Sequence, residues 1–116
     1  MTTVLTKLKN WGCDVDGAME RFMGDEELYA SCLQAVVNDK AYGALYDALM
    51  ENNCQKAFDS AHTLKGVLAN MGLTPMYQIV VEIVEPLRAG NMENLLPKYE
   101  ILVGANEQLR SIIENQ

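Results

Sequence analysis

The sequence predicts an all-α fold, an antiparallel four-helix bundle with additional short N-terminal helices. Apolar residues recur at the three- and four-residue spacing of amphipathic helices, and no sustained alternation of apolar and polar residues indicates a strand. Short runs of turn-forming residues separate the helical segments, as antiparallel neighbours require. The 116 residues, of which 49% are apolar, suit one domain with one core, so we expect a single helical domain over residues 1–116.

Glycines separate the first three expected helices. A short helix is expected over residues 4–11, before Gly12, and a second over residues 17–23, before Gly24. Asp25 fits the N-cap of a third helix, because its carboxylate can accept hydrogen bonds from the free N–H groups of the first turn. The apolar stripe of this third helix is expected to comprise Leu28, Cys32, Ala35 and Val36.

The pair Asn52-Asn53 separates the next two helices. The fourth is expected over residues 41–50, and the asparagines end it because Asn tolerates the left-handed conformation and also caps helices. The fifth is expected to begin near Cys54 and to end at Gly72, a natural C-cap. The residues expected to face the core are Leu45, Ala48 and Leu49 in the fourth helix, and Ala57, Ala61, Leu64, Leu68 and Met71 in the fifth.

Prolines mark the first turns of the last two helices. Thr74 is expected to cap the sixth helix and Pro75 suits its first turn, whereas residues 89–91 form the next turn. Pro97 either lies in the first turn of the seventh helix or kinks it. The expected core stripes are Met76, Ile79, Val80, Ile83 and Leu87 in the sixth helix, and Leu95, Tyr99, Leu102, Asn106, Leu109 and Ile113 in the seventh.

Charge and composition exclude several classes of partner. The net charge of −7 repels phosphate backbones and anionic lipid, so we expect no nucleic acid and no membrane partner. The apolar stretch at residues 78–87 contains two glutamates and a proline and is too short to span a bilayer, and the first residues lack the core of a signal peptide. The three cysteines, Cys13, Cys32 and Cys54, have neither disulfide-frame nor zinc-ligand spacing, which suits a reducing cytoplasm. We expect Cys32 and Cys54 to be buried.

The single histidine lies on the outer face of the fifth expected helix. At 100° per residue, His62 falls about 140° from the centre of the core face, so its side chain should face solvent. Its neighbours on that face are Phe58 one turn before, Lys65 and Gly66 one turn after, and Ala69 two turns after. A neutral imidazole can attack a phosphoryl group, a lysine can neutralise its charge, and small residues leave room for a partner. Because no Gly-rich phosphate-binding loop is present, we expect phosphoryl transfer without ATP chemistry.

Simpler interpretations remain open for each of these residues. A lone exposed histidine is usually only solvated, Lys65 alone is an ordinary surface lysine, and Gly66 alone could be a helix-packing contact. One group beside the core stripe of the sixth helix either widens the core or forms an exposed apolar rim for a partner. This group comprises Tyr77, Val81 and Val84.

The stretch "AHTLKGVLANMG" (61–72) resembles the histidine phosphotransfer (HPt) domain of two-component phosphorelays. The segments "MERFMGDEELY" (19–29) and "PLRAGNMENLLP" (86–97) resemble the flanking parts of such domains, so the resemblance covers about residues 12–116. The sequence departs from the family pattern at Val67 and Leu68, where small residues are more usual. The matching motif residues are His62, Thr63, Leu64, Lys65, Gly66, Asn70, Met71 and Gly72.

The resemblance implies a role for each residue around the histidine. His62 would accept a phosphoryl group from a receiver-domain aspartyl phosphate and pass it to the aspartate of another receiver. Lys65 would contact the phosphoryl oxygens, Gly66 would give clearance, and Ala69 and Phe58 would contact the partner. The chain would be a cytoplasmic monomer without its own cofactor or metal, and without kinase or phosphatase activity, since the receiver supplies the Mg²⁺. Its partners would be response-regulator receivers, a hybrid histidine kinase, or both.

Two questions stay open at the level of sequence. Many family members orient the histidine with a Gln or Glu on the following helix, but the matching position here is Val84, which leaves Gln78 or Glu85 as substitutes. The alternative function is a non-catalytic adaptor that binds receivers without phosphotransfer, although an intact set of His62, Lys65 and Gly66 favours the carrier. The initial Met and the full set of expected helices favour a free-standing protein over a piece of a sensor kinase.

Overall fold

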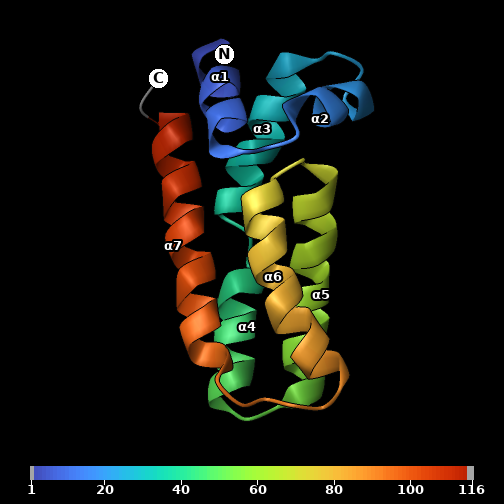
Figure 1. The fold of residues 1–116 in the computed structure, drawn as a ribbon, viewed down its shortest axis with the longest axis vertical. Coiled ribbons are helices and arrows are strands. Elements are labelled where there is room, and N and C mark those ends of the chain that lie inside the picture. Colours follow the sequence, from blue (N-terminus) through green and yellow to red (C-terminus); the bar gives the residue numbers. More distant parts are fainter. Residues whose placement is uncertain (1, 115–116) are drawn as a thin grey trace.

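The computed structural model describes residues 2–114, and within this range the chain forms seven helices and no strand (Figure 1). The predicted all-α fold is confirmed. The helices are α1 (Thr2–Trp11), α2 (Val15–Arg21), α3 (Glu26–Val37), α4 (Ala41–Met50), α5 (Cys54–Asn70), α6 (Thr74–Arg88) and α7 (Leu95–Glu114).

The helices α4, α5, α6 and α7 run antiparallel beside one another, and α1, α2 and α3 lie at one end of this bundle (Figure 1). The helix α3 leads into α4 in the same column, and the twenty-residue α7 lies along both. The Tyr99 hydroxyl of α7 donates to the Tyr42 carbonyl of α4 at 2.9 Å. The predicted four-helix bundle with additional helices at one end is therefore observed.

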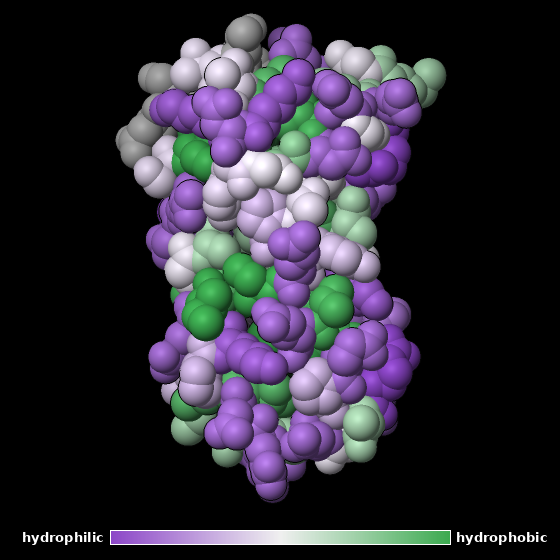
Figure 2. Space-filling view, in the orientation of Figure 1, coloured by the Kyte–Doolittle hydropathy of each residue, from purple (hydrophilic) through white to green (hydrophobic). Residues whose placement is uncertain are grey.

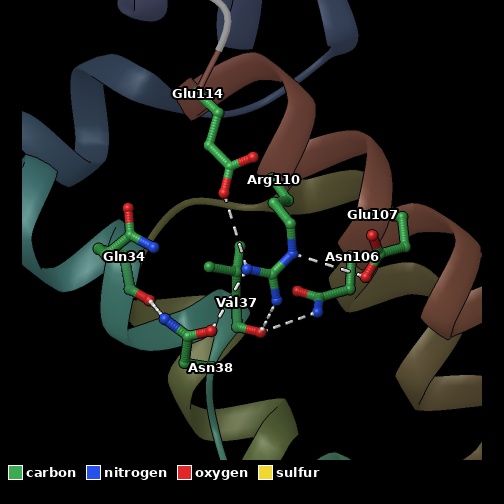
Figure 3. Close-up of polar contacts among 7 residues, drawn as sticks. All are labelled: Gln34, Val37, Asn38, Asn106, Glu107, Arg110 and Glu114. Atoms are coloured by element: carbon green, nitrogen blue, oxygen red, sulfur yellow. Dashed lines mark hydrogen bonds and ion pairs between the residues drawn. The ribbon is translucent and has the colours of Figure 1, made fainter.

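The end of α3 is held by side chains of α7 (Figure 3). The last carbonyls of a helix have no partner within it, and here the Val37 carbonyl accepts from Arg110 at 2.8 Å and from Asn106 at 3.2 Å. Arg110 also donates to the Asn38 side chain at 3.3 Å. Ion pairs orient the guanidinium through Glu107 and Glu114. These contacts set the position of α7 against the break between α3 and α4.

The predicted helix caps are largely confirmed. The Asp25 carboxylate accepts from Leu28 N–H at 3.0 Å, and the Asn53 side chain accepts from Lys56 N–H at 3.1 Å. Asn52 adopts a left-handed φ of 56°, which ends α4 as expected. The second helix begins two residues earlier than predicted.

The starts of α2 and α6 differ from the predicted starts because other residues occupy their N-cap positions. The Asp14 carboxylate accepts from Gly17 N–H at 3.1 Å and caps α2 at Val15. The prediction that Thr74 caps α6 is wrong, because Leu73 occupies the cap position and no side chain caps this helix. Thr74 is the first helical residue, and its hydroxyl donates to the Gly72 carbonyl at 3.4 Å.

The expected core faces of α4 to α7 are confirmed apart from partial exposure of Leu49, Ile79 and Ile113. The expected stripe of α3 is confirmed only in part, because Val36 is buried and the half-buried Cys32 packs against the core. Leu28 is 49% exposed and Ala35 is also exposed, whereas Tyr29 is fully buried. Tyr29 faces inward because its hydroxyl donates to the Met71 carbonyl at 2.8 Å and its ring packs on Phe22. The residues of α3 that face the core are Tyr29, Leu33, Val36 and Val37.

The cysteines only partly follow the prediction. The three thiols are free, and Cys13 is buried, but Cys32 and Cys54 are half-buried rather than buried. The Cys54 thiol lies at the edge between α5 and α6, where it donates to the Leu87 carbonyl at 3.5 Å.

The turn between α5 and α6 depends on Gly72. Its φ of +69° is in the left-handed region, which favours glycine. A Cβ at this position would overlap the Asp14 carbonyl oxygen, and Asp14 N–H donates to the Gly72 carbonyl at 2.8 Å. The connection between α1 and α2 therefore closes directly over the α5–α6 turn.

Both internal prolines are accommodated without ending a helix. Pro86 lies inside α6 and has no N–H for the carbonyl of Glu82, four residues earlier. The Lys98 ammonium of α7 donates to that carbonyl at 3.4 Å instead, and α6 continues to Arg88. Pro97 is the third residue of α7 and lies in its first turn, so it does not kink the helix interior.

Most of the surface over α6 and α7 is hydrophilic, with apolar side chains gathered near its mid-height (Figure 2). Exposed apolar residues are normal on a folded domain when they are dispersed. Those with large exposed side chains are Met23, Leu28, Tyr46, Met50, Leu96 and Ile101. Within the described residues they lie in the loop after α2 and in α3, α4 and α7.

Candidate functional site

The outer face of α5 presents the histidine to solvent, as the helical spacing predicts. His62 is exposed, whereas the adjacent Ala61 and the nearby Leu64 are fully buried on the opposite side of the helix. Burial of that apolar face holds α5 against its neighbours and fixes the direction in which His62 points. The predicted exposure of the histidine is confirmed.

The imidazole stacks on the ring of Phe58. The two ring centroids lie 5.5 Å apart with an interplanar angle of 24°. This separation is within the range of offset aromatic stacking, and the residues are one helical turn apart. Among residues 2–114 the imidazole has no hydrogen-bond partner, so the Phe58 ring is the group that contacts it directly.

The residues one and two turns after His62 leave the surface open. Lys65 is half-buried and forms no ion pair with any residue of the described range. Apart from the backbone of its own helix, a Cβ added to Gly66 would meet no atom within 4 Å, which excludes a helix-packing role for this glycine. Ala69 is exposed on the same face. Lys65, which has no ion-pair partner in this range, and the open space at Gly66 therefore both lie within one turn of His62.

The neighbouring helix α6 does not supply a hydrogen bond to the histidine. Val84 is fully buried in the core, and the Glu85 carboxylate pairs with Arg88 at 3.2 Å. Within the described range, neither Gln78 nor Glu85 is hydrogen-bonded to His62, so the two substitutes that sequence reasoning suggested are not observed in that role. Three apolar residues were expected beside the core stripe of α6. Of these, Val84 belongs to the core, and Tyr77 and Val81 are half-buried.

Sequence reasoning missed Arg88. Its guanidinium carbon lies 5.2 Å from the centroid of the Phe58 ring, on which His62 also stacks. This places a second cation at the site, brought there by the packing of the last turn of α6 against the first turns of α5. The expected antiparallel hairpin around Gly72 places the last turn of the sixth helix beside the first turns of the fifth. The contact between Arg88 and Phe58 also depends on how the two helices are rotated about their axes, which the sequence does not show.

A surface hollow of about 210 Å³ lies at the other end of the α5 face. Arg21 of α2 reaches into this region and donates to the carbonyls of Asn70 at 2.8 Å and Ala69 at 3.2 Å. The arginine thereby satisfies carbonyl groups at the C-terminal end of α5. The hollow is lined by Asp14, Arg21, Leu68, Ala69, Gly72, Thr74 and Tyr77.

The titratable groups whose pKa values are altered lie in the core. Burial raises the pKa of the Cys13 thiol to about 11, and burial also raises the pKa of the Tyr29 and Tyr42 hydroxyls. Within residues 2–114, no group of three or more His, Cys, Asp or Glu side chains could hold a metal ion. In the same range, no helix has the length and apolar character needed to cross a membrane.

Comparison with known families places this site in context. The family model described as "Hpt domain" matches residues 26–115, which is more than half of the chain and contains His62, Lys65 and Gly66. No curated protein and no solved structure matches the chain. Members of the matched family are phosphocarriers that act with receiver domains and kinases in phosphorelays. The chain therefore belongs to the Hpt domain family of histidine phosphotransfer proteins.

Proposed function

We propose that His62 is the phosphoacceptor of a phosphorelay intermediate. The chain would take a phosphoryl group from the aspartyl phosphate of one receiver domain and pass it to the aspartate of another. The observation that carries this proposal is the arrangement on the outer face of α5 within a bundle of the Hpt family. There an exposed imidazole lies near a glycine with open space around it and near Lys65, which has no ion-pair partner among residues 2–114.

The transfer needs only groups that this face and a receiver provide. The imidazole nitrogen that carries the lone pair attacks phosphorus, the bond from phosphorus to the aspartate oxygen breaks, and the carboxylate leaves with the electron pair. Lys65 would stabilise the negative charge on the phosphoryl oxygens, and the Mg²⁺ would be bound by the receiver. Transfer onward is the same step in reverse, with the second aspartate as the nucleophile.

The N-terminal residues that precede the matched family segment pack against the helical bundle, which supports their belonging to the same domain. Arg21 caps the end of α5, and the Asp14 backbone closes over Gly72. We therefore infer one domain over residues 1–116, in which the short helices hold the end of the helix that carries His62.

Labelling with a phosphorylated receiver tests the proposal. With the receiver and Mg²⁺, the chain should gain one phosphoryl group that is labile to acid and stable to base, as expected for a phosphoramidate. His62→Gln should fold normally because the side chain is exposed, and it should not be labelled. Labelling of that variant would overturn the assignment, and ATP alone should label neither protein. Receiver binding without any labelling of the unaltered chain would instead support the adaptor function.

A further inference from the structure

The orientation of the imidazole depends on one aromatic neighbour. His62 is exposed, lacks a hydrogen-bond partner among residues 2–114, and stacks on Phe58 with an interplanar angle of 24°. A side chain on the open face of a helix normally exchanges between rotamers. The flat face of Phe58 favours one ring plane of the imidazole over the others.

Phe58 is itself held from the side of α6. The Arg88 guanidinium carbon lies 5.2 Å from the Phe58 centroid, and the Arg88 Nε donates to the Glu85 carboxylate at 3.2 Å. Phe58 also borders a surface hollow of about 250 Å³ together with Cys54, so its ring has free space on one side. The arginine therefore restrains a ring that core packing alone leaves partly free.

We propose that Phe58 is the positioning residue of the phosphoacceptor, with Arg88 and Glu85 as its support. This inference rests on the proposed function of His62. The aromatic face takes the place of the polar side chain that the buried Val84 cannot provide. The lone pair of an imidazole lies in the plane of its ring, so stacking restrains the ring while leaving both ring nitrogens accessible to an incoming phosphoryl group.

Phe58→Leu is the variant that separates positioning from packing. Leucine retains the apolar bulk at a half-buried position but has no aromatic face. In the unphosphorylated protein, loss of the ring current should move the His62 ring-proton resonances downfield. In single-turnover experiments, the transfer rate within the receiver complex should fall by about two- to tenfold. The affinity for the unphosphorylated receiver should fall by a smaller factor than the transfer rate within the complex, because leucine retains apolar bulk at a position that the resemblance places at the partner contact.

Three further variants complete the experiment. Phe58→Tyr keeps the aromatic face, so its His62 resonances and its transfer rate should be close to those of the unaltered protein. Arg88→Gln removes the cation over the ring and should cause a smaller change in the same direction, which provides a test if Phe58→Leu does not fold. Phe22→Leu is the matched control, since Phe22 is the other half-buried phenylalanine and its ring meets that of Tyr29 edge-to-face instead. It should leave the His62 resonances unchanged.

The readouts distinguish this inference from the proposed function. Unchanged His62 resonances in Phe58→Leu would overturn the positioning role, and this measurement needs no receiver. A lower receiver affinity with a normal transfer rate within the complex would also overturn it and make Phe58 a docking residue. Failure of the unaltered chain to accept phosphoryl groups from phosphorylated receivers would overturn the proposed function, whatever the resonances show.

Discussion

The Lys98 ammonium of α7 donates to the Glu82 carbonyl of α6, which is the carbonyl that Pro86 leaves without its helical donor. A tertiary contact thus replaces a missing backbone hydrogen bond. This allows α6 to continue past a proline to Arg88, the residue that lies over Phe58. The contact therefore connects the packing of α7 with the neighbourhood of His62.

Removal of that lysine should destabilise the bundle. Lys98→Met should lower the free energy of unfolding by about 0.5–1.5 kcal/mol, because it leaves the Glu82 carbonyl without a protein donor. Urea denaturation measures the change, with Lys40→Met as the control, since Lys40 is exposed and forms no ion pair within residues 2–114. In a Pro86→Ala background, which restores the backbone N–H, the effect of Lys98→Met should largely disappear. Equal losses of unfolding free energy in both backgrounds would show that Lys98 does not replace the backbone donor that Pro86 lacks.

Substitution of Gly66 should separate stability from transfer. Gly66→Leu should raise the free energy of unfolding by up to about 1 kcal/mol, because glycine is a poor helix former and a Cβ there has open space. Receiver binding and phosphotransfer should nevertheless fall. Gly104→Leu is the matched control, since Gly104 also lies inside a helix with open space around its Cβ. Normal transfer by Gly66→Leu would show that the gap beside His62 is not used.

Lys65 should act on the phosphoryl group rather than on docking. Lys65→Ala should shift the transfer equilibrium back towards the receiver by less than about tenfold, since exposed charge pairs contribute about 0.2–1 kcal/mol. Its affinity for an unphosphorylated receiver should change little. Lys56→Ala is the control, because a separation of nine residues places Lys56 on the opposite side of α5. A collapse of affinity with a normal rate within the complex would make Lys65 a docking residue.

Gly72 should tolerate substitution less well than another glycine with the same backbone conformation. Gly72→Ala should lower the free energy of unfolding by about 2 kcal/mol or more, because it combines a left-handed φ with overlap at the Asp14 carbonyl. Gly90→Ala has only the conformational penalty of about 1 kcal/mol, since its φ is +78° and nothing lies near its Cβ. Chemical denaturation of the two variants should show this difference, and equal losses would exclude the contact with Asp14 as a cause.

The buried Cys13 thiol should make stability fall at alkaline pH. Its pKa is raised by burial from 9.0 to about 11, so the thiol is protonated in both states below about pH 9 and has no effect there. Between about pH 9 and 11 the unfolded chain ionises while the folded chain stays protonated, which lowers the free energy of unfolding. Cys13→Ala should lose less stability in this window, as measured by denaturation at a series of pH values. If the free energy of unfolding changed equally with pH in both proteins, the raised pKa of Cys13 would be contradicted.

Local patterns were sufficient to predict the helix that carries the site. The periodicity of α5 identified its buried face and the exposure of His62, and Asn53 and Gly72 identified its ends. These properties depend on residues within a turn or two of one another, so they can be derived from spacing and capping chemistry alone. The same local patterns predicted the glycine gap at Gly66.

Tertiary packing decided which side chains surround the histidine. Spacing along α6 could not show that Arg88 lies over Phe58, because that depends on how α6 is rotated against α5 and on Lys98 supporting a helix that contains Pro86. The inward direction of Tyr29, which the stripe assigned to α3 missed, depends on the distant carbonyl of Met71. Such contacts join residues far apart in the chain, and their geometry arises only when complete helices pack together.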